Sequence, residues 1–229
     1  MQKKLHLYSD LHLPIGNKKP YKYISWIFAF WQHANIRKIP FLKKPKIILG
    51  DICEGGKKGL EQKYEPRIAH VAKKLKPAYF VCGNHDLGAK PNKESITLFE
   101  SYFSPLFYSF TCDKQTWVVI SSSLYTATEL DAYARKKKRQ QNQFLQTVQG
   151  NCILCFHDPN AYTQIKQHLV QANVEHIFCG HLHTPILNKN QEITIVPSIG
   201  GLFFLNQNTY LEFSQNTIRR KKIKEKSLD

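Results

Sequence analysis

Residues 5–12 read Leu-His-Leu-Tyr-Ser-Asp-Leu-His, and this stretch sets a pattern that recurs along the chain. A short apolar run predicts a strand over about 4–9, and two polar side chains, Asp10 and His12, follow it directly. Because the carboxyl ends of strands line the ligand crevice of an open α/β sheet, we expect such side chains to converge. Four later strand ends carry similar groups: Gly50-Asp51, Gly83-Asn84-His85-Asp86, Phe156-His157-Asp158 and Gly180-His181-Leu182-His183.

Short runs rich in Val, Ile, Phe, Tyr and Leu predict ten strands. They fall at about 4–9, 46–50, 78–82, 106–111, 116–122, 151–156, 175–179, 192–196, 202–205 and 208–213. Helical periodicity marks about 21–35, 59–75, 92–102, 127–148 and 160–172. The first half alternates strand and helix, which favours parallel pairing, and the crowded strands of the second half favour antiparallel pieces. We expect an α/β fold, with two mixed β-sheets packed together and flanked by helices.

Composition excludes several classes of protein. The chain has 229 residues, of which 42% are hydrophobic and 22% charged, so it is long enough for one sizeable core and too apolar to be disordered. We expect a single domain over 1–229 with a basic tail at about 217–229. The N-terminus does not resemble a signal peptide and no apolar run approaches the roughly 20 residues of a membrane span, so we expect a cytoplasmic protein without a transmembrane segment, peripheral membrane contact being the alternative.

The six cysteines, at 53, 82, 112, 152, 155 and 179, are expected to be reduced thiols. Cys152 and Cys155 have the spacing of a metal or redox pair, but they lie in a predicted strand. Residues three apart in a strand point to opposite faces, which argues against joint metal binding.

The residue types at the strand ends suit a metal ion. In Asp10-Leu11-His12 and His181-Leu182-His183, an extended backbone would place the outer two side chains on one face while the Leu turns into the core. Imidazole, carboxylate and amide oxygen together suit Mn, Fe or Zn, and the absence of thiolate argues against a structural zinc site. Each motif alone is weak, since Gly, Asn and Asp also form ordinary turns.

Taken together and in this order, the motifs resemble the signature of the calcineurin-like metallophosphoesterases over about residues 5–201. Val196-Pro197-Ser198-Ile199-Gly200-Gly201 resembles the segment that follows the last motif in many members. The resemblance implies a four-layer αββα sandwich that holds two divalent metal ions, Mn foremost and Fe, Zn or Ni as alternatives. It implies that Asp51 bridges the ions, that His85 acts as an acid, and that Asp86 orients His85. The remaining implied ligands are Asp10, His12 and His183 for the first ion, and Asn84, His157 and His181 for the second.

The implied activity is hydrolysis of a phosphomonoester or phosphodiester by a hydroxide that bridges the two ions. The substrate would be a phosphorylated small molecule or a nucleotide. Protein serine/threonine phosphatases are disfavoured, because the stretch from Asp51 to Gly56 lacks their phosphate-binding Arg. UDP-diacylglucosamine pyrophosphatases resemble the chain at Ser9–Leu13 and Gly50–Glu54 but usually have Arg where His85 stands. A lipid-precursor hydrolase of this kind is one alternative, and a binding module with a structural metal is another.

The formal net charge of +16 favours polyanionic partners such as nucleic acid or an anionic membrane. The bases concentrate in residues 1–50, in 135–139 and in the tail from Arg219, which we expect to be a frayed, solvated terminus. The aromatic stretch from Tyr21 to Trp31 is either the first core helix or an exposed cap that meets lipid or bases. The run Arg135–Arg139 is either the solvated start of a helix or part of a basic rim around an anion-binding cleft. Nothing in the sequence specifies an oligomeric state.

Overall fold

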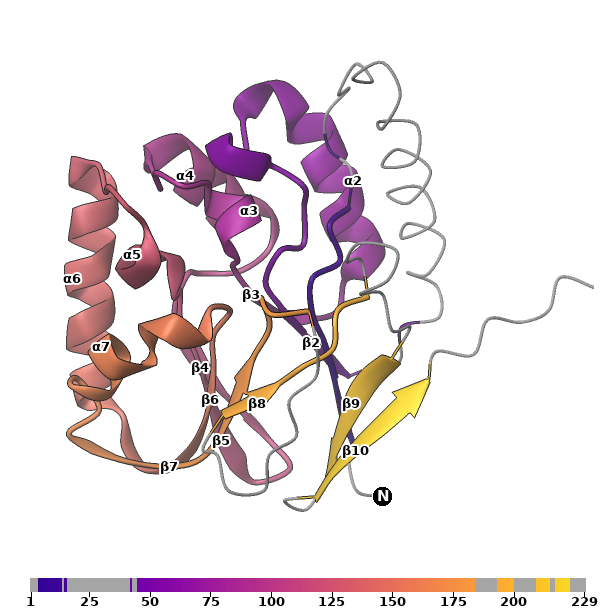
Figure 1. Ribbon diagram of the computed structural model, residues 1–229, viewed down its shortest axis with the longest axis vertical. Coiled ribbons are helices and arrows are strands. Elements are labelled where there is room, and N and C mark those ends of the chain that lie inside the picture. The colour runs from indigo at the N-terminus through magenta and orange to yellow at the C-terminus, as the bar shows by residue number, and fades with distance from the viewer. Residues whose placement is uncertain are drawn as a thin grey trace, which may run out of the picture.

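Two five-stranded sheets form the centre of the computed structural model, which describes residues 4–13, 15, 42, 45–183, 193–199, 209–214 and 217–222 (Figure 1). The strand order of the first sheet is β10-β9-β1-β2-β3, and that of the second is β4-β5-β6-β7-β8. The first sheet consists of β1 (Leu5–Tyr8), β2 (Lys46–Leu49), β3 (Tyr79–Val81), β9 (Thr209–Ser214) and β10 (Thr217–Lys222). The second consists of β4 (Tyr108–Cys112), β5 (Gln115–Val119), β6 (Gln149–Cys155), β7 (Gln171–Cys179) and β8 (Ile193–Ile195).

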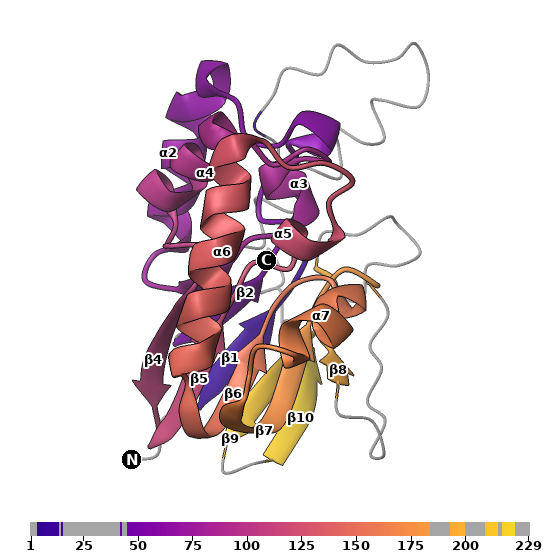
Figure 2. The same ribbon diagram turned by 90° about the vertical axis from the view of Figure 1, so that its left-hand side faces the viewer.

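Helices cover both outer faces of the paired sheets (Figures 1 and 2). On the first sheet, α2 (Glu65–Leu75) and α4 (Lys93–Tyr102) bury their apolar faces in one cluster with Tyr8, Ile48 and Phe80. On the second, α6 (Ala132–Thr147) and α7 (Tyr162–Lys166) pack against alternate residues of β5, β6 and β7. Two short helices, α3 (Asn84–Leu87) and α5 (Ser123–Thr126), follow β3 and β5. The expected αββα order of layers is confirmed.

A third apolar cluster lies between the sheets and holds them together. Leu7 of β1 and Leu49 of β2 meet Trp117 of β5 and Phe178 of β7, and the exposed fraction of each side chain is 1% or less. Burial of an apolar side chain of this size contributes about 1.5–3 kcal/mol, so this layer fixes the position of one sheet on the other. Strands buried on both faces read as nearly continuous apolar runs, which is why they are visible in the sequence.

The strand pairing confirms the antiparallel pieces expected in the second half of the chain, but only in part. β5, β6, β7 and β8 run parallel, and antiparallel pairing among the described strands is confined to β4 with β5, β1 with β9 and β9 with β10. The reason is connectivity: α6 joins β5 to β6 and α7 joins β6 to β7, as in the first half of the chain.

Several element boundaries also differ from expectation. The strand expected over 116–122 ends at Val119, and the helix expected over 127–148 begins at Ala132, because Asp131 caps it by accepting a hydrogen bond from the Ala134 amide at 2.7 Å. The helix expected over 160–172 ends at Lys166. β7 begins at Gln171, four residues early, because its polar first half pairs with the polar start of β6.

The C-terminal tail is not simply a frayed terminus. Residues 217–222 form β10, which pairs antiparallel with β9, and Ile218 packs against the layer between the sheets. The strand expected over 202–205, the helix over 21–35 with the stretch Tyr21–Trp31, Gly200-Gly201 and the last seven residues lie outside the described residues.

All six cysteines are free, and Cys152 and Cys155 belong to different apolar clusters on opposite faces of β6. This confirms the expectation that the side chains of Cys152 and Cys155 point to opposite faces of the strand. Among the residues that the structure describes, no helix is long and apolar enough to cross a bilayer.

Candidate metal centre

The polar groups that follow the strands come together at one end of the two sheets. They lie at the carboxyl ends of β1, β2 and β3 in one sheet and of β6 and β7 in the other (Figure 1). Three groups of residues could each hold a metal ion, because the potential ligand atoms within a group all lie within 4.8 Å of one another. The groups are Asp10, His12 and His183; His12, Asp51 and His85; and Asp51, His157 and His181. Residues from distant parts of the sequence therefore share one site.

Backbone geometry, rather than extended alternation, directs the side chains into this site. The backbone φ is 52° at Asp10, 44° at His12, 47° at Asp51, 68° at His181 and 59° at His183, all in the left-handed region. Residues other than glycine enter this region at a cost of about 1–2 kcal/mol each. Strain of this kind concentrates at functional sites, where the surrounding structure enforces it.

The two leucines between the ligands behave differently. Leu11 is buried as expected, with 2% of its surface exposed, but Leu182 is 44% exposed. The expectation that both leucines turn into the core is therefore wrong for Leu182. Its neighbours on both sides have left-handed backbones, so the strand geometry on which that expectation rested ends before it.

Two glycines allow the site residues to approach one another. A Cβ atom at Gly83 would lie 2.1 Å from the Asp51 Oδ1 atom, and one at Gly50 would lie 2.4 Å from His157 Nδ1. Gly50 also has a φ of 80°. These positions accept no side chain, so the glycines allow Asp51 and His157 to approach the neighbouring backbone closely.

The first cluster of ligands surrounds the carboxylate of Asp10. His183 Nε2 lies 3.3 Å from Asp10 Oδ1. His12 Nε2 lies 3.9 Å from the same oxygen and 3.7 Å from Asp51 Oδ2. Ser198, in the segment after the last motif, donates a hydrogen bond from Oγ to the Asp10 carbonyl oxygen at 3.3 Å and so packs that segment against the end of β1.

The second cluster lies on the other side of Asp51. His157 Nε2 lies 3.2 Å from Asp51 Oδ2 and 3.1 Å from Asn84 Oδ1. His181 Nδ1 lies 3.1 Å from Asn84 Oδ1 and 3.3 Å from His157 Nε2. Asp51 therefore has one oxygen within 4 Å of a histidine from each cluster.

Hydrogen bonds fix which nitrogen of two histidines faces the site. His12 Nδ1 donates to Glu54 Oε2 at 2.8 Å, and His157 Nδ1 donates to the Leu49 carbonyl oxygen at 2.9 Å. A carboxylate or carbonyl can only accept, so in each neutral ring the lone pair is on Nε2, which faces the cluster. A hydrogen bond on the far nitrogen is the usual way in which proteins orient a metal-binding histidine.

Glu54, rather than Asp86, forms the side-chain hydrogen bond with the ring of His85. The Nδ1 of His85 donates to Glu54 Oε1 at 2.8 Å. Asp86 is fully buried, and its carboxylate accepts hydrogen bonds from the backbone amides of Ile52, Cys53 and Gly83 at 3.3, 2.9 and 2.9 Å. The carboxylate expected to orient His85 thus holds the two ligand loops together.

Glu54 is a site residue that the sequence did not reveal. Its position three residues after Asp51, in a loop that carries a ligand, was the available signal. That signal could not show which way the side chain points.

The charges of the site favour bound cations. Burial alone would lower the pKa of His157, but the Asp51 and Asp10 carboxylates raise it to about 10. Burial would likewise lower the pKa of His12, yet the bond to Glu54 and nearby carboxylates raise it to about 9. Burial would raise the pKa of Asp51, and the surrounding histidines hold it far below its usual range instead. The buried carboxylates therefore require compensating positive charge.

One buried atom tests directly whether these residues fit a metal ion. His12 Nε2 is buried and makes no hydrogen bond, although it faces two carboxylates. A buried polar atom without a partner is costly, and a divalent cation between these groups would satisfy it. Imidazole, carboxylate and amide oxygen are ligands for ions of intermediate hardness.

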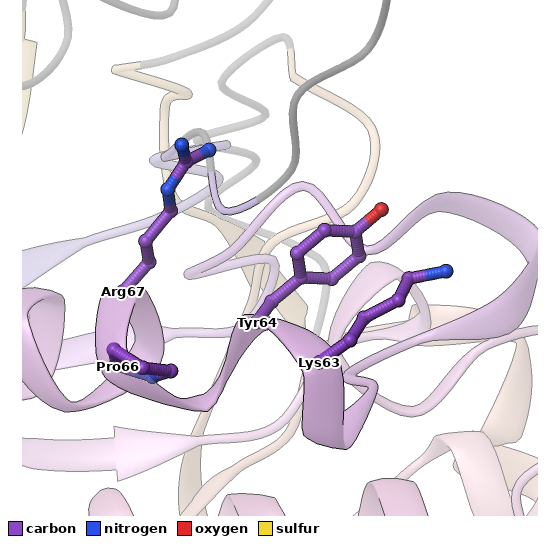
Figure 3. A pocket seen from close by; sticks show the side chains of 4 residues that line it. All are labelled: Lys63, Tyr64, Pro66 and Arg67. Atoms are coloured by element: carbon purple, nitrogen blue, oxygen red, sulfur yellow. The ribbon is translucent and has the colours of Figure 1, made fainter.

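A hollow of about 210 Å³, lined by Lys63, Tyr64, Pro66 and Arg67, is separate from this ligand set (Figure 3). Lys63 Nζ pairs with Glu61 Oε1 at 3.1 Å, and Arg67 donates to the Ile15 carbonyl oxygen at 3.4 Å. Its cations are therefore engaged with the protein itself, and it offers none of the ligand types of the metal centre.

The family model of the calcineurin-like phosphoesterases matches residues 3–185. No curated protein sequence gives a significant match. Among solved structures, the phosphoesterase Yfce from E. coli is 14% identical, with 97% of this chain and 100% of that chain covered and a TM-score of 0.42. A hypothetical protein from Thermus thermophilus is 12% identical, with 96% and 98% covered and a TM-score of 0.46.

The matched range takes in every residue of the two ligand clusters. The matched range also contains the ends of β1, β2, β3, β6 and β7, which the fold brings to one edge of the paired sheets. The chain therefore belongs to the calcineurin-like phosphoesterase family, whose members are hydrolases acting on phosphoester bonds.

Proposed function

We propose that the protein hydrolyses phosphomonoesters or phosphodiesters with two divalent metal ions, Mn foremost, held by the two clusters. The observation that carries this proposal is the position of Asp51. Its Oδ2 atom lies 3.7 Å from His12 Nε2 and 3.2 Å from His157 Nε2, which suits a carboxylate shared by two ions. When bound, such a pair of ions supplies hydroxide near neutral pH and neutralises the attacked phosphoryl group.

The ligand roles follow from the two clusters. Asp10, His12 and His183 hold the first ion, and Asn84, His157 and His181 hold the second. The backbone amide of His85 donates to Asp51 Oδ1 at 2.8 Å, so the oxygen that does not face His12 and His157 is also held in place. The bonds from His12 and His157 to Glu54 and Leu49 hold the two rings in the ligand tautomer.

His85 is the acid of this reaction. Burial would lower the pKa of His85, but the bond to Glu54 and the charges of Asp51 and Glu54 raise it, which favours the imidazolium near neutral pH. A protonated His85 can stabilise the charge that develops on the phosphoryl group or give a proton to the leaving oxygen. Such catalysis typically contributes about 10²–10⁴ in rate.

The substitution Asp51→Asn tests the proposal. It removes the charge shared by the two clusters, so we expect both ions to bind more weakly and turnover to be abolished. The assay is Mn-stimulated release of p-nitrophenol from bis-p-nitrophenyl phosphate, together with metal content by elemental analysis. Asp113→Asn is the matched control, because Asp113 lies in the exposed β4–β5 turn with a φ of 50°, which Asn tolerates. Normal metal content and activity in Asp51→Asn would refute the proposed role of this residue.

A further inference from the structure

The exposed face of α6 is a continuous basic and polar surface. The exposed residues of this helix fall within one arc of its circumference, and none of them is a large apolar residue. Bases occupy the first half of the helix and glutamines the second half. In chain order the surface consists of Ala132, Arg135, Lys136, Arg139, Gln140, Gln143, Gln146 and Thr147.

Two of the three bases on this surface, Lys136 and Arg139, have little local compensation, whereas Arg135 donates to the Leu130 carbonyl oxygen at 2.6 Å. The helix from Ala132 to Thr147 contains five bases and no acid. Lys137 pairs with Glu100 at 2.7 Å, whereas Lys136 and Arg139 make no ion pair within the described part of the chain. Lys138 is half-buried, and its Nζ lies 4.6 Å from the centre of the Tyr125 ring rather than beside a carboxylate.

This arrangement is unfavourable for the isolated protein. The five cations occupy positions 4 to 8 of the helix in unbroken succession. Arg135 and Arg139 are also four residues apart, and like charges at that spacing destabilise a helix by about 0.2–0.5 kcal/mol. An external polyanion would offset this repulsion.

The chemistry of the surface favours nucleic acid over a lipid bilayer. A helix that lies in a membrane interface needs an exposed apolar face, but Leu145 is fully buried and Phe144 is half-buried against Phe107. Guanidinium, ammonium and amide groups are instead the side chains that contact phosphates and sugars along a nucleic-acid backbone. In Figure 2, α6 lies nearest the viewer, and no other labelled element crosses in front of it.

We propose that the exposed face of α6 binds the phosphate backbone of a nucleic acid through Arg135, Lys136 and Arg139. The contacts are to the backbone, so binding is independent of base sequence and strongly dependent on salt. The proposal does not depend on the metal centre, because none of these three residues belongs to it.

The experiment compares two matched double variants of the full chain. Lys136→Gln/Arg139→Gln removes two charges from the surface, and Lys73→Gln/Lys74→Gln removes two charges from exposed positions on α2. Binding to a short fluorescent DNA duplex is measured by anisotropy at several salt concentrations, without added divalent metal so that the probe stays intact. Melting temperatures establish that both variants fold, and the α6 variant is expected to melt no lower than the parent because charge repulsion is relieved.

The proposal predicts a loss of affinity greater than about tenfold near 0.1 M salt for the α6 variant and less than about twofold for the α2 variant. The slope of log K against log salt should fall by about 1.8 for the α6 variant, since each lost phosphate contact removes about 0.9. Equal losses in the two variants would show that net charge alone acts and would overturn the proposal. So would a parent chain that binds phosphatidylserine vesicles through these residues but not the duplex.

Discussion

Glu54 accepts a hydrogen bond from His85 with its Oε1 atom at 2.8 Å. Its other oxygen accepts from His12 at the same distance. One carboxylate therefore orients both a proposed metal ligand and the proposed acid, and it binds the two rings as a unit. The bonds from the two rings also hold the pKa of Glu54 well below its usual range, against the effect of burial, so the carboxylate stays ionised.

Glu54→Gln should lower kcat by about 10²-fold while leaving much of the metal bound. The amide has one oxygen to accept a hydrogen bond, so it can serve one imidazole N–H but not both. The measurements are kcat with bis-p-nitrophenyl phosphate and metal content. Glu129→Gln is the control, since Glu129 pairs with Lys90 on the surface, away from the metal centre. If Glu54→Gln and Glu129→Gln have the same kcat, the shared carboxylate has no role in turnover.

His85→Ala should retain metal but lose most of kcat, about 10²–10⁴-fold. The ring of His85 lies near His12 and Asp51, so its position would also allow it to act as a metal ligand of the first cluster. Metal content separates the two roles. Loss of an ion from His85→Ala would show that His85 is a ligand and not the acid.

Activity should fall on the alkaline side of the pH profile. The pKa of His85 is raised in the folded protein, so the imidazolium is present below that pKa and is lost as pH rises through it. In Glu54→Gln the hydrogen bond to the carboxylate and its charge are removed while the charge of Asp51 remains, so the alkaline limb of kcat against pH should move to lower pH. If the alkaline limb stays at the same pH in this variant, the titration of a group other than His85 causes it.

Asp86→Asn should destabilise the fold by about 1–3 kcal/mol without a direct effect on His85. Both Asp86 oxygens accept backbone N–H groups, and the amide nitrogen of Asn would face at least one of these donors. Denaturant unfolding measures the change, with Asp113→Asn expected to lie within about 0.5 kcal/mol of the parent. Equal stability of the two variants would show that the amide network around Asp86 contributes nothing.

Buried strands and the residue types after them could be predicted from the sequence. β1, β2, β3, β6 and the buried end of β7 are short apolar runs, and each is followed by a group that the fold brings to one edge. The gathering of Asp10, Asp51 and His157 follows from that rule alone. Element ends were less predictable, because they depend on partners such as the start of β6 that extends β7.

Side-chain direction in the site could not be predicted. Glu54 and Asp86 are both acids in ligand loops, and only the backbone turns decide that one faces His85 and the other faces amide groups. The exposure of Leu182 has the same origin, since left-handed residues on both sides replace the expected extended backbone. The sequence did not predict β10, because four bases in succession are typical of a solvent-exposed segment. Pairing with β9 requires only backbone hydrogen bonds and one face of the strand that packs on the protein.

The left-handed conformation of five proposed ligands has a consequence for how this site can change over generations. A glycine at any of these positions would relax the main chain, because glycine enters the left-handed region without steric cost. Asp or His at all five turns therefore lowers the stability of the fold, which is the pattern that the proposed metal centre would select for.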